Sequence, residues 1–166
     1  MMYVSRAAAW TGLAACLSAA PATPSYVGLL PDAVGVTEIY LADARSGLAL
    51  QGFDPTIYLL EGKPGLGLPG QEAVWGGLAW RFASGANKAA FLRDPESFLP
   101  RLGGYDAEAA GRGVLVRSDP LVWLRRSGRI YLFRTMAARE RFDRRPEAPE
   151  QAEDRWRALR AGLVQD

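Results

Sequence analysis

A strand that runs directly into a capped helix is the feature that most limits how this chain can fold. In the stretch "LAWRFASGANKAAF", Leu78, Trp80 and Phe82 alternate with other residues, so they share one face of a strand. Ser84 follows closely, and serine accepts hydrogen bonds from the free N–H groups at the start of a helix. Apolar residues then recur at helical spacing as far as Phe91. The stretch therefore predicts a strand whose aromatic face packs on the helix that follows it.

Turn residues divide the rest of the chain into short elements. The pair Gly76–Gly77 indicates the tip of one hairpin, and Ser127–Gly128 indicates a second. The glycine-rich residues 101–116 are expected to be irregular, and no internal repeat is visible. The predicted elements are strands over 36–42 and 56–62, hairpins over 71–84 and 121–133, and helices after Ser84, after Asp94, from Thr135 to about Arg144 and over 150–163. The pattern predicts a small single α+β domain over residues 36–166, built from β-hairpins and short helices, with a C-terminal amphipathic helix.

The composition excludes several kinds of chemistry. The chain has no histidine and a single cysteine, Cys16, so an intramolecular disulfide is impossible. The nitrogen and sulfur ligands that Zn, Cu and Ni prefer are missing from every residue after Cys16. The formal net charge of +2 is too small to indicate a nucleic-acid partner.

The N-terminal residues have the pattern of a secretory signal. Arg6 is followed by a short apolar run and then by small residues, and the run is too short for a comfortable membrane span. The small residues "APA" predict cleavage by signal peptidase, which makes residues 1–22 the signal peptide and the proline-rich residues 23–35 a spacer. This processing predicts a periplasmic or secreted protein.

A second processing site competes with the first. The residues "LAAC" resemble a bacterial lipobox, in which Cys16 is lipidated and becomes the new N-terminus. The signal would then span residues 1–15, and the protein would be anchored to a membrane of the cell envelope through Cys16. Both alternatives remain open at this point, and both place the protein outside the cytoplasm.

Three stretches together resemble the YHS-domain family, in its secreted bacterial branch. "GFDPTIYLLEGKPGLG" resembles the opening G-Y-D-P-V-A-Y-F-x-x-G-K-P of that branch. "GLAWRFASGANKAAFLRDPESFLPRLGGYDA" resembles its core W-R-F-A-S-x-x-N-x-x-x-F-x-x-D-P-x-x-Y-x-P-x-x-G-G-Y-C-A, and "WLRRSGRIYLF" resembles its tail hairpin. The likeness runs from about Ala49 to the last helix, and it implies a YHS-like fold for most of the chain.

The metal-ligand positions of the family are substituted in this chain. Metal-binding relatives place cysteines at F-C-S-x-x-C, where this sequence has Ala83 and Asn87. The cysteine of G-G-Y-C-A is replaced by Asp106, and the histidine that names the family is missing. The resemblance therefore implies the fold, whereas the thiolate and histidine chemistry of the family cannot be carried over.

Polar residues within these stretches are the remaining candidates for a binding site. They are Asp54, Tyr58, Tyr105 and Asp106. Asp54 and Asp106 could supply oxygen ligands to a hard cation such as Ca²⁺ or Mg²⁺. The competing interpretations are that Asp54 is a turn or capping carboxylate beside Pro55, and that Asp106 is a solvated loop acid.

No acid–base pair for catalysis can be named, because the chain lacks histidine and any thiol after Cys16. We therefore expect a non-catalytic cell-envelope module that has no cofactor and binds a small ligand or an envelope protein. The alternative is a metal-binding protein that uses the oxygen ligands of Asp106 and Asp54.

Overall fold

The computed structural model describes residues 39–163. The predicted signal peptide, Cys16, the spacer and the first residues of the predicted strand over 36–42 lie outside this range. Within it, no helix is long and apolar enough to cross a membrane.

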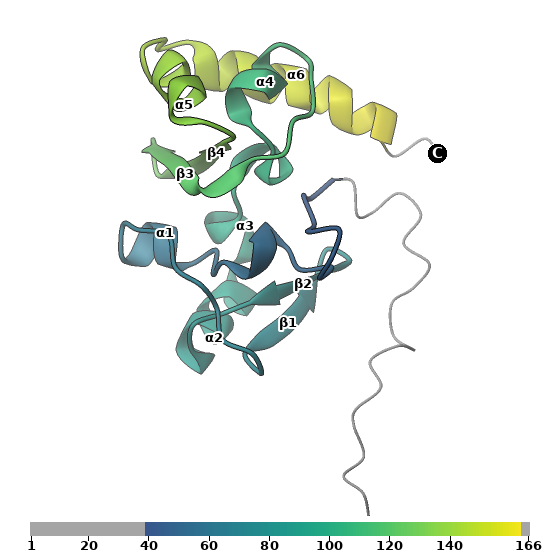
Figure 1. Ribbon diagram of the computed structural model, residues 1–166, viewed down its shortest axis with the longest axis vertical. Coiled ribbons are helices and arrows are strands. Elements are labelled where there is room, and N and C mark those ends of the chain that lie inside the picture. The colour runs from purple at the N-terminus through teal and green to yellow at the C-terminus, as the bar shows by residue number, and fades with distance from the viewer. Residues whose placement is uncertain (1–38, 164–166) are drawn as a thin grey trace, which may run out of the picture.

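The described chain is an α+β domain of short helices and two antiparallel hairpins, as the sequence predicts. The first elements are η2 (Leu50–Gly52), α1 (Ile57–Leu60), β1 (Glu72–Trp75), β2 (Leu78–Arg81), α2 (Gly85–Arg93) and α3 (Pro95–Phe98). The later elements are η3 (Arg101–Gly104), α4 (Ala107–Gly111), β3 (Asp119–Arg126), β4 (Arg129–Phe133), α5 (Met136–Asp143) and α6 (Ala148–Leu163). Figure 1 shows β1, β2 and α2 on one side of the molecule, and β3, β4, α4, α5 and α6 on the other.

Both predicted hairpins are confirmed. β1 pairs with β2 so that Trp75 faces Leu78, and β3 pairs with β4 so that Arg126 faces Arg129. The two turn residues of each hairpin have positive φ, with values of 58° and 78° in the pair Gly76–Gly77. Two positive φ angles match the right-handed twist of the strands, which is why glycine is favoured at such turns.

The predicted helix starts are also confirmed. Ser84 Oγ accepts a hydrogen bond from Asn87 N at 3.1 Å, and Thr135 Oγ1 accepts one from Ala138 N at 3.1 Å. Pro95 occupies the first turn of α3, where its missing N–H costs nothing. The last helix begins at Ala148, and its buried face includes Ala152 and Trp156.

The structure corrects three predictions of local structure. Residues 56–62 were predicted as a strand, but Ile57–Leu60 form the helix α1, which follows the turn held by Asp54. The range 101–116 was predicted as irregular, but it contains η3 and α4. The described part of the predicted strand 36–42 contributes only an isolated bridge between Ala42 and Ala49.

The molecule contains an internal repeat, which corrects the prediction that there is none. The first half (residues 49–93) and the second half (residues 101–143) have the same order of elements: a short 3₁₀ turn, a short helix, a hairpin and a capped helix. Counterparts lie 51 or 52 positions apart. They are Leu50 and Leu102, Gly52 and Gly104, Asp54 and Asp106, Trp80 and Tyr131, Phe82 and Phe133, Ser84 and Thr135, and Phe91 and Phe142.

Backbone and ring geometry support this repeat. Three consecutive residues have positive φ in each half, with values of 51°, 55° and 83° from Leu50 and of 58°, 62° and 81° from Leu102. The ring centroids of Phe82 and Phe91 are 5.1 Å apart, and those of Phe133 and Phe142 are 5.2 Å apart. The similarity between the two halves of the molecule therefore extends from the turns to the core.

Strand β4 belongs to the hydrophobic cores of both halves. Ile130 and Leu132 pack in the core of the first half, whereas Tyr131 and Phe133 pack in the core of the second. All four side chains are buried. Because successive strand residues point to opposite faces, one strand can fill two cores, and it joins the halves into one domain.

Candidate functional site

Asp54 is a buried structural carboxylate with four hydrogen bonds. Its Oδ1 accepts from the N–H of Thr56 at 2.8 Å and from Thr56 Oγ1 at 2.7 Å. Its Oδ2 accepts from the N–H of Ala83 at 2.7 Å and from Asn87 Nδ2 at 2.8 Å. A carboxylate accepts about four hydrogen bonds, so Asp54 has no acceptor capacity left for a ligand. It is the turn carboxylate that the sequence suggested, and it also fastens α1 to the start of α2.

The N–H of Ala83 and the side-chain amide of Asn87 both donate to Asp54. The buried Asp54 carboxylate therefore holds Ala83, which follows β2, close to the first turn of α2.

Tyr58 is fully buried beside Asp54 in the first half. Its hydroxyl donates to the carbonyl of Pro120 at 2.9 Å, and its ring meets Trp123 edge-on with centroids 5.6 Å apart. Burial, together with the nearby charges of Asp119 and Asp54, raises the pKa of Tyr58 far above its ordinary value. Tyr58 therefore joins α1 to β3 as a neutral phenol.

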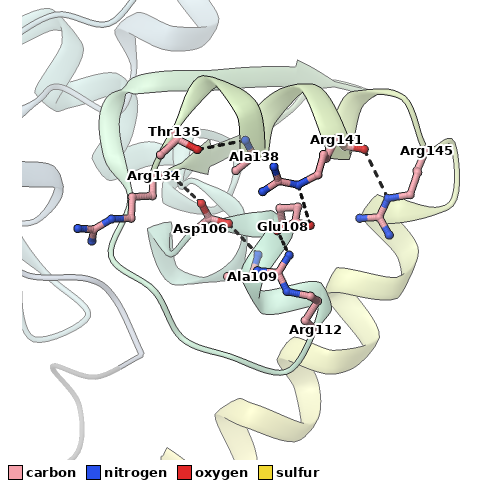
Figure 2. A network of polar contacts seen from close by, with 9 residues as sticks. All are labelled: Asp106, Glu108, Ala109, Arg112, Arg134, Thr135, Ala138, Arg141 and Arg145. Atoms are coloured by element: carbon pink, nitrogen blue, oxygen red, sulfur yellow. Dashed lines mark hydrogen bonds and ion pairs between the residues drawn. The ribbon is translucent and has the colours of Figure 1, made fainter.

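Asp106 occupies in the second half the position of Asp54 in the first. Figure 2 shows its carboxylate between the start of α4 and the end of β4. Oδ1 accepts from the N–H of Ala109 at 2.7 Å, and Oδ2 accepts from the N–H of Arg134 at 2.6 Å. Asp106 is only 3 % exposed, so the interpretation of a solvated loop acid is wrong. Its neighbour Tyr105 is partly buried, with its ring 5.9 Å from that of Trp156.

Glu108, a buried residue of α4, makes further polar contacts in the second half. Its carboxylate pairs with Arg112 within α4 and with Arg141 of α5, where Arg141 Nε lies 3.4 Å from Oε1 (Figure 2). Glu108 is 6 % exposed, and the two arginines neutralise its buried charge. The network ties α4 to α5.

The four residues proposed from the sequence do not form one site. Asp54 and Tyr58 lie in the first half, whereas Tyr105 and Asp106 lie at the equivalent place in the second, and the two aspartates share no hydrogen-bond partner. Within residues 39–163, no group of three or more Asp, Glu, His or Cys residues is arranged to hold a metal ion.

A pocket of about 340 Å³ lies between the segment that links the halves and helix α6. We call it the arginine pocket. Its walls come from four parts of the chain: the first described residues, α3 with η3, the start of β4, and α6. The charged or aromatic residues that line it are Tyr40, Glu96, Arg101, Arg129, Glu153, Trp156, Arg157 and Arg160.

Positive charge exceeds negative charge in the arginine pocket. Arg101 makes a two-pronged ion pair with Glu153, with N–O distances of 2.6 and 2.7 Å. Glu153 also lies 3.8 Å from Arg129 and accepts a hydrogen bond from Tyr131 at 3.3 Å. For Arg160, the described residues provide no carboxylate within 4.0 Å.

The pKa is raised both for Tyr40, which lines the pocket, and for Tyr131, which is hydrogen-bonded to the pocket residue Glu153. Burial and the charge of Glu96 raise the pKa of Tyr40, although Arg160 and Arg101 oppose this effect. Burial and Glu153 likewise raise the pKa of Tyr131. Both phenols therefore stay protonated at neutral pH, and Tyr40 can act as a hydrogen-bond donor toward the pocket.

Comparison with known proteins gives no match. No protein-family model matches the chain, and neither the curated proteins nor the solved structures contain a match to it. The site is therefore judged on its geometry.

Sequence reasoning missed the arginine pocket. Arg101, Arg129 and Arg160 come from three separate elements, and no motif connects them. The only sequence signal is the mixture of arginines and acidic residues in the last helix, which is equally typical of an exposed helix face.

Proposed function

We propose that the protein is a non-catalytic, YHS-like module of the cell envelope that binds a small anionic ligand in the arginine pocket. The observation that carries this proposal is the charge imbalance of the pocket. Arg101 and Arg129 share the carboxylate of Glu153, and Arg160 lacks an ion-pair partner among the described residues. Guanidinium groups pair with carboxylates and phosphates through two parallel hydrogen bonds, so an anion is the natural occupant.

The size and walls of the pocket suit a small ligand. Its volume of about 340 Å³ is at the lower end of the range for small-molecule sites. Trp156 and Leu99 add apolar surface beside the charged groups, and the Tyr40 hydroxyl adds a neutral donor. The envelope location in this proposal rests on the signal pattern of residues 1–22.

The metal-binding alternative has less support. Asp54 already accepts four hydrogen bonds, and Asp106 accepts two from backbone N–H groups that would otherwise be buried without partners. A cation at either carboxylate would have to displace hydrogen bonds that hold the fold together.

Isothermal titration calorimetry with small anions tests the proposal. We expect phosphate, succinate or citrate to bind with a dissociation constant below about 1 mM, and binding to weaken as salt is added. Arg160→Ala should weaken binding by about tenfold, because it removes the arginine that has no ion-pair partner among residues 39–163. Spermidine, a small cation, should not bind.

Arg93→Ala is the matched control, since Arg93 is an exposed arginine at the end of α2 and outside the pocket. It should leave anion binding unchanged. The proposal would be refuted if no anion of the panel bound, or if Arg93→Ala and Arg160→Ala weakened binding equally.

A further inference from the structure

A second pocket lies where β3 meets α5. Its volume is about 290 Å³. We call it the β3 pocket, and it is lined by Leu121, Trp123, Leu124, Arg125, Met136 and Arg139. It shares no residue with the arginine pocket.

The β3 pocket contains a buried hydrogen-bond donor without an acceptor. The Nε atom of Arg139 is buried and has no hydrogen-bond partner, the one such side-chain atom found in residues 39–163. A buried donor without an acceptor is destabilising, and more so when the group is charged. Neither Arg139 nor Arg125 has a carboxylate within 4.0 Å in this part of the chain. The pocket thus presents two uncompensated guanidinium groups.

The other walls of the β3 pocket are apolar and exposed. Leu121 is 60 % exposed and Met136 is 52 % exposed, and both stand beside the half-buried ring of Trp123. Apolar side chains gathered around a free charge are unusual at a surface without function, because they gain nothing from contact with water.

We propose that the β3 pocket binds a small amphiphilic carboxylate, with the carboxylate on Arg139 and a short apolar chain against Leu121, Trp123 and Met136. A planar carboxylate can accept hydrogen bonds from the guanidinium of Arg139, and Arg125, which has no carboxylate within 4.0 Å among the described residues, adds a second positive charge to the pocket. A carboxylate also costs less to dehydrate than a phosphate dianion, which matters at a partly buried atom. The volume of about 290 Å³ accommodates one such group with a short chain.

Octanoate, kept below its micelle concentration, is the probe, and calorimetry on the whole protein is the assay. Acetate lacks the apolar chain and octanol lacks the charge. We expect octanoate to bind. Acetate and octanol should each bind at least about tenfold more weakly, because acetate lacks the apolar contacts and octanol lacks the charged contact with arginine.

Two variants assign the binding to this pocket. Arg139→Gln removes the charge and the orphaned donor, and Leu121→Glu places a negative charge at an exposed position in the wall, where folding should be unaffected. Both should reduce octanoate binding by about tenfold or more. Arg144→Gln changes an exposed arginine that directly follows the C-terminal end of α5 and lies outside the pocket, and it should have no effect.

The outcome is independent of the proposed function. Arg160→Ala should leave octanoate binding unchanged, and Arg139→Gln should leave the binding of small polar anions unchanged. The inference is overturned if octanoate does not bind, if acetate or octanol binds as tightly, or if Leu121→Glu binds like the unaltered protein. Binding to anionic phosphatidylglycerol vesicles without binding to octanoate would also overturn it.

Discussion

Substitution of Asp54 by asparagine tests whether this carboxylate holds the fold together. The side chain is fully buried, and its four hydrogen bonds connect α1, β2 and α2. Asparagine has the same shape but presents one oxygen and one NH₂ group. Whichever way the amide turns, the N–H of Thr56 or the N–H of Ala83 then faces an NH₂ and loses its acceptor.

The size of the effect follows from these contacts. One buried donor without an acceptor costs about 1–3 kcal/mol, and the change from a charged to a neutral acceptor weakens each remaining bond by about 1 kcal/mol. The remaining oxygen keeps two hydrogen bonds, so for Asp54→Asn we expect the free energy of unfolding to fall by about 3–5 kcal/mol. Asp106→Asn, at the equivalent position, should cost only about 2–4 kcal/mol, because that carboxylate accepts two hydrogen bonds.

Urea unfolding followed by far-UV circular dichroism at pH 7 measures both losses. Asp143→Asn is the control, since the Asp143 side chain is 50 % exposed and pairs with Arg126 at 3.4 Å. Such a surface pair contributes at most about 1 kcal/mol. Equal midpoints for Asp54→Asn and the control would refute the structural role. Unchanged stability with a lost response to Ca²⁺ or Mg²⁺ would favour the metal alternative.

Three further predictions concern the core, the buried phenol and the N-terminus. Trp80→Ala removes a side chain that is 1 % exposed, and it should lower the free energy of unfolding in urea by about 3–5 kcal/mol. Arg81→Ala removes one partner of the ion pair with Glu72 and should lower it by less than about 1 kcal/mol. Equal losses would show that the wrong strand face was placed in the core. The pKa of Tyr58 is raised in the folded state, so the stability that this side chain contributes is complete below about pH 10 and declines as the pH rises further. When the urea unfolding midpoint is measured against pH, the decline should be smaller in Tyr58→Phe than in the unaltered protein. An equally steep alkaline decline of the urea midpoint in Tyr58→Phe and in the unaltered protein would contradict this prediction. If the lipobox is used, Cys16→Ser should move the protein from the membrane fraction to the soluble fraction, and unchanged fractionation would leave cleavage after residue 22.

Local signals in the sequence predicted the elements whose structure is decided locally. Glycine pairs at the turns, the serine and threonine caps at Ser84 and Thr135, and the proline after Asp94 each act within a few residues. The alternation of Leu78, Trp80 and Phe82 also identified the buried face of β2 correctly, since all three are buried.

Features that depend on distant residues were missed. Ile57 and Tyr58 favour a strand by composition, yet the turn at Asp54 and the hydrogen bond from Tyr58 to Pro120 place them in a helix. Asp106 resembles a loop acid until Arg134, which lies 28 positions away, donates its N–H to it.

The internal repeat was missed for a related reason. Its two halves share conformations more than residue identities. Trp80 corresponds to Tyr131, Ser84 corresponds to Thr135, and the hairpin lengths differ between β1–β2 and β3–β4. The arginine pocket could not be found either, because it forms only when the two halves and α6 are in place.

The shared strand β4 has a consequence for the order of events on the ribosome. Ile130 and Leu132 complete the core of the first half, but they are synthesised after all of its own residues. The nascent first half therefore emerges with one side of its core open and stays incompletely folded until β4 has followed it. A chain that stopped before residue 130 would keep that opening permanently and would be exposed to proteases.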